Sequence, residues 1–322
     1  MGDKYLDIIK KIATLVQEEK IQEAVDEFEK IPIEEMTDLD LLLYGTLSFE
    51  VRNYSRVIDI FENRIDKRVR VTEILRIMAR SYEELGKVDM ANKYYQDALA
   101  TGEEYPEVYF DYAYALDEQG NTEDAIKYYK KTIEIEPKSF WAYVNLGSIY
   151  EKQNKDEEAI KYFLEAYKLD NKISMVNFNL GVSYVKLKDY EKGKKHYLEE
   201  LKTENPYPYT YYNLGLLYKN YYDDFNNARY YYLQSISTVG KMLEDNKELE
   251  KLYYSSWYNL GCLYAIYKDY DNATDCFKYI CYKKKKYLDY IYSDEELKEY
   301  RSSELFKEVD QLLGGSDEKL HH

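Results

Sequence analysis

Small and aromatic side chains recur four positions apart along the chain, at the spacing that places two side chains on one face of an α-helix. The pairs are Ala91 and Tyr95, Ala125 and Tyr129, Ala159 and Phe163, and Ala273 and Phe277. Each pair predicts an amphipathic helix whose apolar face carries the alanine and the ring.

A second small residue stands twelve or thirteen positions before each of these helices. Four small residues of this kind are the glycines of Asn-Leu-Gly triplets at residues 145–147, 179–181, 213–215 and 259–261. The first three glycines are 34 residues apart, and the same step backwards from Gly147 reaches three further small residues, Ala113, Ala79 and Gly45. One more step of 33 residues reaches Ile12, so a single register runs through the chain.

Each repeat therefore contains two helices that approach closely at the small residue, with the aromatic ring filling the space beside the contact. The positions of proline and glycine support this division, because proline falls between repeats and glycine falls between the two helices of a repeat. The residues are Pro106, Pro137, Pro206 and Pro208, and Gly86 and Gly120. Only 13 Gly and 5 Pro occur in 322 residues, too few for a sheet-rich chain with many tight turns. The predicted fold class is all-α, built from antiparallel helical hairpins.

The pattern resembles the tetratricopeptide repeat (TPR) family. Pro137, Trp141 and the four Leu-Gly pairs carry the resemblance best, and it covers about residues 5–287. It implies a right-handed α-solenoid of about eight hairpins, whose first helices line a concave groove, and a non-catalytic role in docking peptides or protein segments. The expected units are 5–37, 38–71, 72–105, 106–139, 140–173, 174–207, 208–253 and 254–287.

Two departures from the repeat are expected to change its surface. Gly215 and Gly261 are 46 residues apart, with one extra residue near 223–225 and eleven between Tyr232 and Trp257. The eleven residues make about three turns, so they should lengthen the second helix of unit seven and the first helix of unit eight. Residues 288–314 are predicted to form a terminal capping helix that opens with a capping box at 293–296. The tail, 315–322, ends in two histidines and is interpreted as partly a purification tag.

The candidate binding residues are first the four asparagines before Leu-Gly, namely Asn145, Asn179, Asn213 and Asn259. Their repeat position faces the groove, and an amide can pair with both the N–H and the C=O of an extended peptide. The alternative is local hydrogen bonding within the repeats. Eight such bonds contribute roughly 1 kcal/mol each, whereas ordering nine peptide residues costs on the order of 9 to 18 kcal/mol, so apolar anchors must supply affinity.

The candidate anchors are aromatic residues on the first helices, for which packing between repeats is the alternative. They are Phe110, Tyr114, Trp141, Phe178, Tyr209, Tyr212 and Tyr258. Arg76 and Arg80, one turn apart, are candidates to meet an acidic group at one end of the groove, unless they pair with Glu73, Glu83 or Glu84. From the fourth unit onward, the groove positions carry acidic or apolar residues in place of cations. They are Glu107, Asp111, Val144, Val182 and Leu216.

Charge and composition weigh against other function classes. The 45 basic and 61 acidic residues give a net charge of -16, which disfavours nucleic-acid binding. No phosphate loop, HExxH or GxSxG motif occurs, and the three cysteines are read as reduced, packed thiols, so we expect no enzyme, cofactor or metal site. Without an apolar signal or spanning segment, the protein is expected to be soluble and cytoplasmic, with no membrane insertion.

Two function classes remain at this stage. The first is a peptide-binding adaptor whose groove captures an extended segment of a protein partner. The second is a scaffold or sensor that docks a folded partner through its convex face, through the lengthened hairpin or through the C-terminal helix. Neither the partner nor the oligomeric state follows from the sequence.

Overall fold

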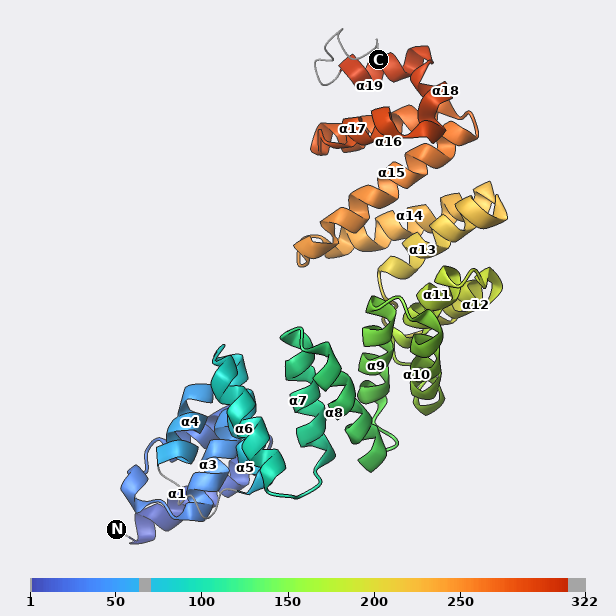
Figure 1. Cartoon of the computed structure of the whole chain (residues 1–322). Coiled ribbons are helices and arrows are strands. Elements are labelled where there is room, and N and C mark those ends of the chain that lie inside the picture. Colours follow the sequence, from blue (N-terminus) through green and yellow to red (C-terminus); the bar gives the residue numbers. More distant parts are fainter. Residues whose placement is uncertain (1, 64–70, 312–322) are drawn as a thin grey trace. The chain divides into compact units, whose positions relative to one another are not determined.

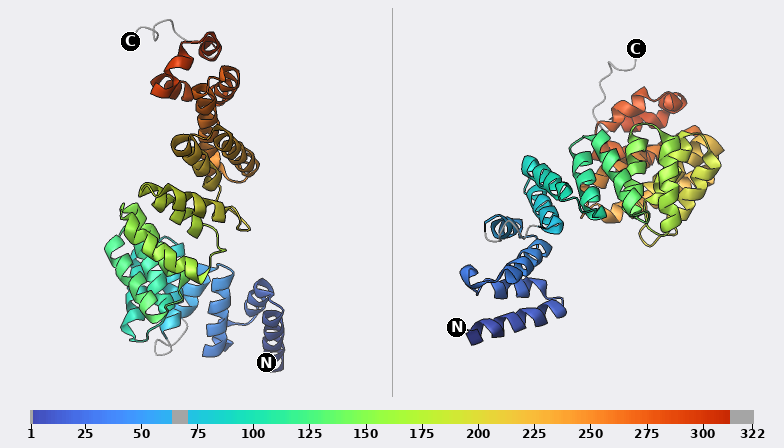
Figure 2. Two further views of the ribbon diagram at one scale, coloured as in Figure 1. Left: turned by 90° about the vertical axis from the view of Figure 1, so that its right-hand side faces the viewer. Right: turned by 60° about the horizontal axis from the view of Figure 1, so that its bottom comes forward.

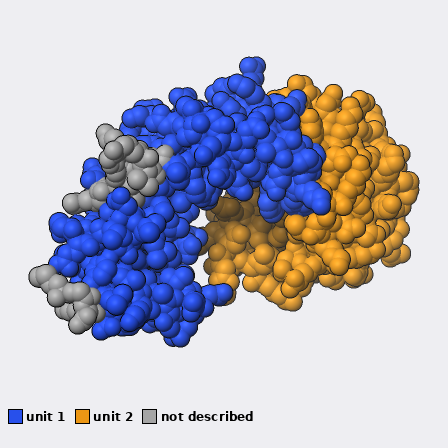
Figure 3. All heavy atoms as spheres, turned by 90° about the horizontal axis from the view of Figure 1, so that it is seen from below, with its two compact units in different colours: residues 1–149 blue, residues 150–322 orange. Residues whose placement is uncertain are grey.

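A computed structural model describes residues 2–63 and 71–311, and within these ranges the chain forms helices and no strands (Figure 1). The prediction of an all-α fold is confirmed. The chain divides into two compact units, residues 1–149 and 150–322, whose boundary falls within helix α9 (Figure 3). The tail 315–322 and the end of the expected capping helix lie outside the described residues.

Unit 1 consists of consecutive helical hairpins, each joined by a turn of three residues (Figure 2). Its helices are α1 (Gly2–Gln17), α2 (Ile21–Phe28), α3 (Asp38–Glu50), α4 (Tyr54–Asn63), α5 (Thr72–Glu84), α6 (Val88–Ala100), α7 (Pro106–Glu118), α8 (Thr122–Ile135) and the greater part of α9 (Phe140–Lys152), with a 3-10 turn η1 (Ile33–Glu35). Pro106 is the first residue of α7. A backbone N–H at this position would have no partner within the helix, so proline loses no hydrogen bond there.

Unit 2 continues the same arrangement and ends in shorter helices. Its elements are α10 (Asp156–Leu169), α11 (Val176–Lys186), α12 (Tyr190–Glu200), α13 (Tyr209–Leu217), the π-helix η3 (Tyr218–Tyr222), α14 (Phe225–Met242), η4 (Lys247–Leu249), α15 (Glu250–Ile266), α16 (Tyr270–Lys283), α17 (Tyr287–Ser293), η5 (Glu295–Leu297), α18 (Lys298–Arg301) and α19 (Glu304–Gln311). Helices α14 and α15 contain 18 and 17 residues, which matches the expectation that the insertion lengthens both.

The turn inside each hairpin contains one residue with positive φ, the left-handed conformation that commonly ends a helix. The eight residues are Glu19, Arg52, Gly86, Gly120, Asn154, Lys188, Asp223 and Lys268. Glycine, which adopts this conformation without strain, occupies only two of these sites. The turns thus repeat in backbone geometry even where the sequence shows no turn signal.

The small residues lie where two helices touch, as the repeat pattern predicted. A Cβ atom added at Gly181 would meet the ring of Tyr197 at 2.5 Å, and one added at Gly215 would meet Tyr232 at 2.6 Å. The ring of each second helix therefore packs directly on the backbone of the first helix in the same hairpin.

The C-terminal cap is built from α17, α18 and α19 in place of one continuous helix. Asp294 accepts a hydrogen bond from the backbone N–H of Glu296 and starts η5, whereas the sequence suggested Ser293 as the cap. The cap covers the last hairpin, because Tyr300 is buried against Phe277 and its hydroxyl contacts Thr274 Oγ1 at 2.8 Å.

Candidate functional site

The position two residues before the small residue of a first helix carries the polar side chains of the site. It is occupied by Asn145, Asn179 and Asn213 at intervals of 34 residues, and by Asn259 after the insertion. The same step back from Asn145 reaches Asp111, an acid at the equivalent place in α7. The polar series therefore extends one repeat further than the Asn-Leu-Gly motif, and its first member is charged.

Two of the asparagines bind a tyrosine from the second helix of the preceding hairpin. Nδ2 of Asn145 donates to Tyr129 Oη at 2.9 Å, and Nδ2 of Asn213 donates to Tyr197 Oη at 3.2 Å. Both tyrosine rings are buried, and both hydroxyls need a partner inside the protein. Local hydrogen bonding, the alternative role for these residues, thus occupies one N–H of each amide and leaves its Oδ1 acceptor without a bond among the described residues.

The other two asparagines differ because their surroundings differ. The residue 16 positions before Asn179 is Phe163, which has no hydroxyl, and Asn179 is 8% exposed with no side-chain hydrogen bond among the described residues. Nδ2 of Asn259 donates to Tyr212 Oη at 3.2 Å and to the Ser255 carbonyl at 3.0 Å. The four amides therefore do not form one uniform set.

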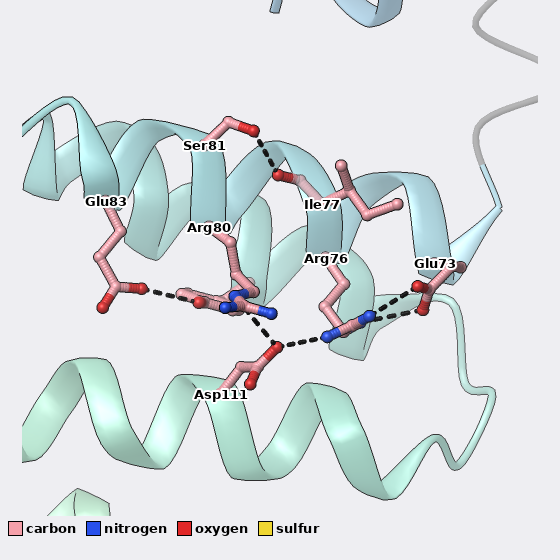
Figure 4. A network of polar contacts seen from close by, with 8 residues as sticks. Glu73, Arg76, Ile77, Arg80, Ser81, Glu83 and Asp111 are labelled. Atoms are coloured by element: carbon pink, nitrogen blue, oxygen red, sulfur yellow. Dashed lines mark hydrogen bonds and ion pairs between the residues drawn. The ribbon is translucent and has the colours of Figure 1, made fainter. Parts of the chain in front are cut away.

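Arg76 and Arg80 both approach Asp111 across the contact between α5 and α7 (Figure 4). Arg76 donates through Nη1 to Asp111 Oδ2 at 2.5 Å, and through Nε and Nη2 to Glu73 at 2.9 and 2.6 Å. Burial opposes its charge, but the hydrogen bonds and charges of Glu73 and Asp111 raise the pKa of Arg76 above its usual value. Pairing with Glu73, an alternative foreseen from the sequence, is present, and Arg76 is held by Glu73 and Asp111 at once.

A cavity of about 410 Å³ in unit 1 brings several predicted residues together. Arg80, Phe110, Tyr114, Trp141 and Asn145 line it. Its remaining lining residues are Glu83, Glu84, Tyr95 and Asp111. Most of these side chains come from the first helices α5, α7 and α9, as expected of a groove lined by first helices.

A second cavity, of about 310 Å³, adjoins the first and shares Phe110, Asp111 and Trp141 with it. It extends toward the start of α7 and α9, where Arg76 and Phe140 contribute to its wall. Trp141 thus stands between two hollows of unit 1 with half of its surface, 51%, exposed.

The predicted aromatic residues of unit 2 are engaged in packing. Phe178 lies 4.7 Å from Tyr207 between ring centroids, and Tyr209 stacks on Tyr207 at 5.4 Å. The ring of Tyr212 packs near Tyr232. Tyr258 donates from its hydroxyl to Asp294 Oδ2 at 2.7 Å and contacts rings of α17, so it holds the C-terminal cap.

Unit 2 has its own cavity, of about 390 Å³, on the side of α11, α12 and α13. Asn213 is the predicted site residue that lines it. Its other walls are mostly apolar or aromatic and come from Val182, Val185, Lys186, Tyr190, Tyr197, Leu216, Leu217, Asn220 and Tyr221. Lys186 is paired with Glu151 at 2.6 Å, which leaves this cavity without a free cation among the described side chains.

The acids of the first cavity are the residues that sequence reasoning missed. The sequence puts Asp111 at a groove position without assigning it a role, and it suggests Glu83 and Glu84 only as partners of arginine. The 34-residue step that relates Asp111 to Asn145 was available in the sequence. Nothing in it showed that Tyr95 Oη donates to Glu83 at 2.9 Å and turns that carboxylate toward the cavity wall.

Comparison with known proteins agrees with the hairpin architecture. The family model of the middle TPR-like domain of cilia and flagella-associated protein 70 matches residues 75–204, and that of a tetratricopeptide repeat matches residues 254–278. These matches confirm the predicted resemblance to the tetratricopeptide repeat family. No curated protein matches it.

A solved structure of a TPR protein shares this fold. The C-terminal part of a TPR repeat-containing protein from Cytophaga hutchinsonii superposes with a TM-score of 0.64 at 18% identity, over 80% of this chain and 98% of the other. A crystal structure of MamA matches at 22% identity over 53% of this chain and 94% of its own, with a TM-score of 0.47.

TPR arrays are generally non-catalytic modules of protein–protein interaction, and at this coarse level the function follows from the family. Within the described part of the chain, no helix combines the length and the hydrophobicity needed to cross a bilayer.

Proposed function

We propose that this TPR protein binds an extended segment of a protein partner along the first helices of its hairpins. The observation that carries the proposal is the pair of adjoining cavities in unit 1, which gathers Phe110, Tyr114, Trp141 and Asn145 on α7 and α9. Large side chains with exposed rings beside a hollow are the usual energetic centres of peptide-binding surfaces.

Tyr114 and Trp141 are the anchors of the proposed site. They are 48% and 51% exposed, although residues of this size are normally covered in a monomer. Covering an aromatic side chain contributes on the order of 2 kcal/mol, so two anchors offset the cost of ordering about two peptide residues. The second cavity gives room for a further side chain next to Trp141.

The asparagines contribute acceptors in this proposal. Because Nδ2 of Asn145 and of Asn213 is held by tyrosine, each amide presents Oδ1 to a peptide N–H. One such bond contributes about 1 kcal/mol, which is enough to fix the register of the peptide and too little to hold it alone. In unit 2, the apolar cavity beside Asn213 offers a pocket for an aliphatic or aromatic side chain.

The experiment is partner capture from native cell extract, with Trp141→Ala and Tyr114→Ala compared with the wild type. Tyr282→Ala is the matched control, because Tyr282 is 75% exposed on α16 and lines neither cavity. Circular dichroism and thermal melting confirm equal folding before capture. We expect a specific partner that is lost with either groove variant and kept with Tyr282→Ala.

Equal capture by all variants contradicts binding at the unit 1 cavities. The site would then be sought on the lengthened helices α14 and α15, where a folded partner is the alternative. A synthetic peptide scan of the captured partner then distinguishes the two cases, because only an extended segment is reproduced by a short peptide.

A further inference from the structure

The larger cavity of unit 1 combines exposed aromatic faces with an excess of negative charge. Three carboxylates line it, from Glu83, Glu84 and Asp111, against the single guanidinium of Arg80. Tyr114 and Trp141 form the aromatic part of its wall. This composition differs from that of the cavity beside α11, α12 and α13, whose wall holds no carboxylate.

The two arginines near this cavity, Arg76 and Arg80, already have acidic partners. Arg76 is held between Glu73 and Asp111, and Arg80 lies 3.7 Å from Asp111 with its guanidinium 5.1 Å from the ring centre of Phe49. Both arginines therefore pair with Asp111. Neither of them forms an ion pair with Glu83 or Glu84, the other two acids of the wall.

Glu83 and Glu84 carry the uncompensated charge. Glu83 accepts a hydrogen bond from Tyr95 Oη at 2.9 Å, a neutral donor, and neither glutamate forms an ion pair among the described residues. Burial raises the pKa of Glu83, and the charges of Asp111 and Glu84 add to this effect, against the hydrogen bond from Tyr95 and the positive charge of Arg80. A cation brought by a ligand would supply a counter-charge.

We propose that this cavity binds the guanidinium of an arginine in the partner segment, with the plane against Trp141 and Tyr114 and the N–H groups toward Glu83 and Glu84. The inference rests on the proposed function and names the side chain that the groove selects. Arginine fits better than lysine, because its flat, weakly hydrated group stacks on aromatic faces and pairs with two carboxylate oxygens at once. The cavity volume of about 410 Å³ accommodates one long side chain with adjacent backbone.

The chain contains its own reporter for this site. Only two tryptophans occur, Trp141 in the cavity wall and Trp257, whose indole Nε1 is buried in unit 2. Nitrogen-15 labelling of the indoles should give two side-chain signals in an NMR spectrum, assigned with Trp141→Phe. The probe is N-acetyl-arginine amide, and N-acetyl-citrulline amide, of the same shape without the charge, is the matched control.

We expect the arginine probe to move the Trp141 signal saturably, with a dissociation constant of about 1 mM or weaker for so small a ligand, and to leave Trp257 unchanged. The citrulline probe should produce no saturable shift. Glu83→Gln/Glu84→Gln should weaken arginine binding at least about tenfold, because charge-assisted hydrogen bonds are lost. Glu123→Gln/Glu157→Gln removes the same number of charges from exposed helix faces and should bind as the wild type does.

Glu84→Gln alone is the control for a folding defect in the double variant, since Glu84 is exposed and its replacement disturbs no packing. No saturable shift with arginine, equal shifts with citrulline, or full binding by Glu83→Gln/Glu84→Gln would each overturn the arginine pocket. Partner capture that depends on Trp141 while the probe experiment fails would reject the arginine pocket and keep the groove function. Failure of both would reject the groove as well.

Discussion

Tyr197 Oη accepts a 3.2 Å hydrogen bond from Nδ2 of Asn213, and this bond joins α12 to the first helix of the next hairpin. Tyr129 and Asn145 form the equivalent bond in unit 1, at 2.9 Å. Each bond satisfies a tyrosine hydroxyl on a buried ring. Asn145 and Asn213 therefore hold neighbouring hairpins together, whatever they do for a ligand.

Asn213→Ala and Tyr197→Phe should each lower the free energy of unfolding by about 1 kcal/mol, because each removes one partner of the same buried bond. The double variant should lose less than the sum of the two, which urea denaturation measures. If peptide binding also uses Asn213, Tyr197→Phe keeps the affinity for a captured peptide while Asn213→Ala lowers it. Equal affinities for the two variants would assign Asn213 to stability alone.

Gly181→Ala should destabilise the protein by about 1–3 kcal/mol, because the new methyl group would lie 2.5 Å from the Tyr197 ring and the hairpin must open to admit it. Gly240→Ala is the matched control in a helix interior. Its Cβ would approach Tyr253 only to 3.2 Å, and alanine favours the helix, so the change should be smaller or stabilising. Thermal melting of both variants decides between steric and propensity effects.

Lys188→Gly should stabilise the protein. Lys188 has a φ of 63° and is exposed, and a residue with a Cβ pays about 1–2 kcal/mol for the left-handed conformation. Glycine also loses more conformational entropy on folding than lysine does, so the net gain in unfolding free energy is about 0.5–1 kcal/mol. The reverse change, Gly120→Lys, should cost a similar amount at a φ of 79°. A lower unfolding free energy for Lys188→Gly would contradict the prediction.

The repeated features of the fold were predictable from the sequence because they depend on spacing. The 34-residue register located the contact between Gly181 and Tyr197, and the two extra segments of the seventh unit, since each follows from helix geometry alone. The left-handed turn at Lys188 was not predictable, because a lysine there gives no local signal and the conformation is imposed by the hairpin packing.

The candidate site was predictable in its location more than in its chemistry. Phe110, Tyr114 and Trp141 were chosen by repeat position and do line one cavity, whereas Tyr258 at the same kind of position packs on α17. The charge of the cavity depends on which acid each arginine selects. The contact of Arg76 with Asp111, 35 residues away, is a tertiary choice that helical spacing does not determine.

Glu200 is expected to stabilise the two connections that precede α11 and α13. Its carboxylate is fully buried and accepts hydrogen bonds from Ser174 Oγ at 2.8 Å and from the backbone N–H groups of Met175 and Tyr207. Glu200→Ala leaves these donors unsatisfied and should cost about 2–4 kcal/mol in urea denaturation. Glu199→Ala, its more exposed neighbour, should change stability by less than about 0.5 kcal/mol.

His196 should make the stability of the protein fall as the pH drops below neutral. Burial lowers the pKa of His196 to about 4, with a smaller contribution from Lys195, and its Nδ1 lies 3.0 Å from Asn177 Oδ1. The unfolded chain has a histidine pKa of about 6.5, so between pH 6.5 and 4 it binds a proton that the folded protein excludes. The stabilisation is thus complete above pH 6.5 and declines with falling pH, by about 2 kcal/mol at pH 5. His196→Gln lacks the titration, so urea denaturation at pH 7.5 and pH 5 should show a larger loss for the wild type than for the variant. Equal losses would mean that the folded protein takes up the proton as readily as the unfolded chain does.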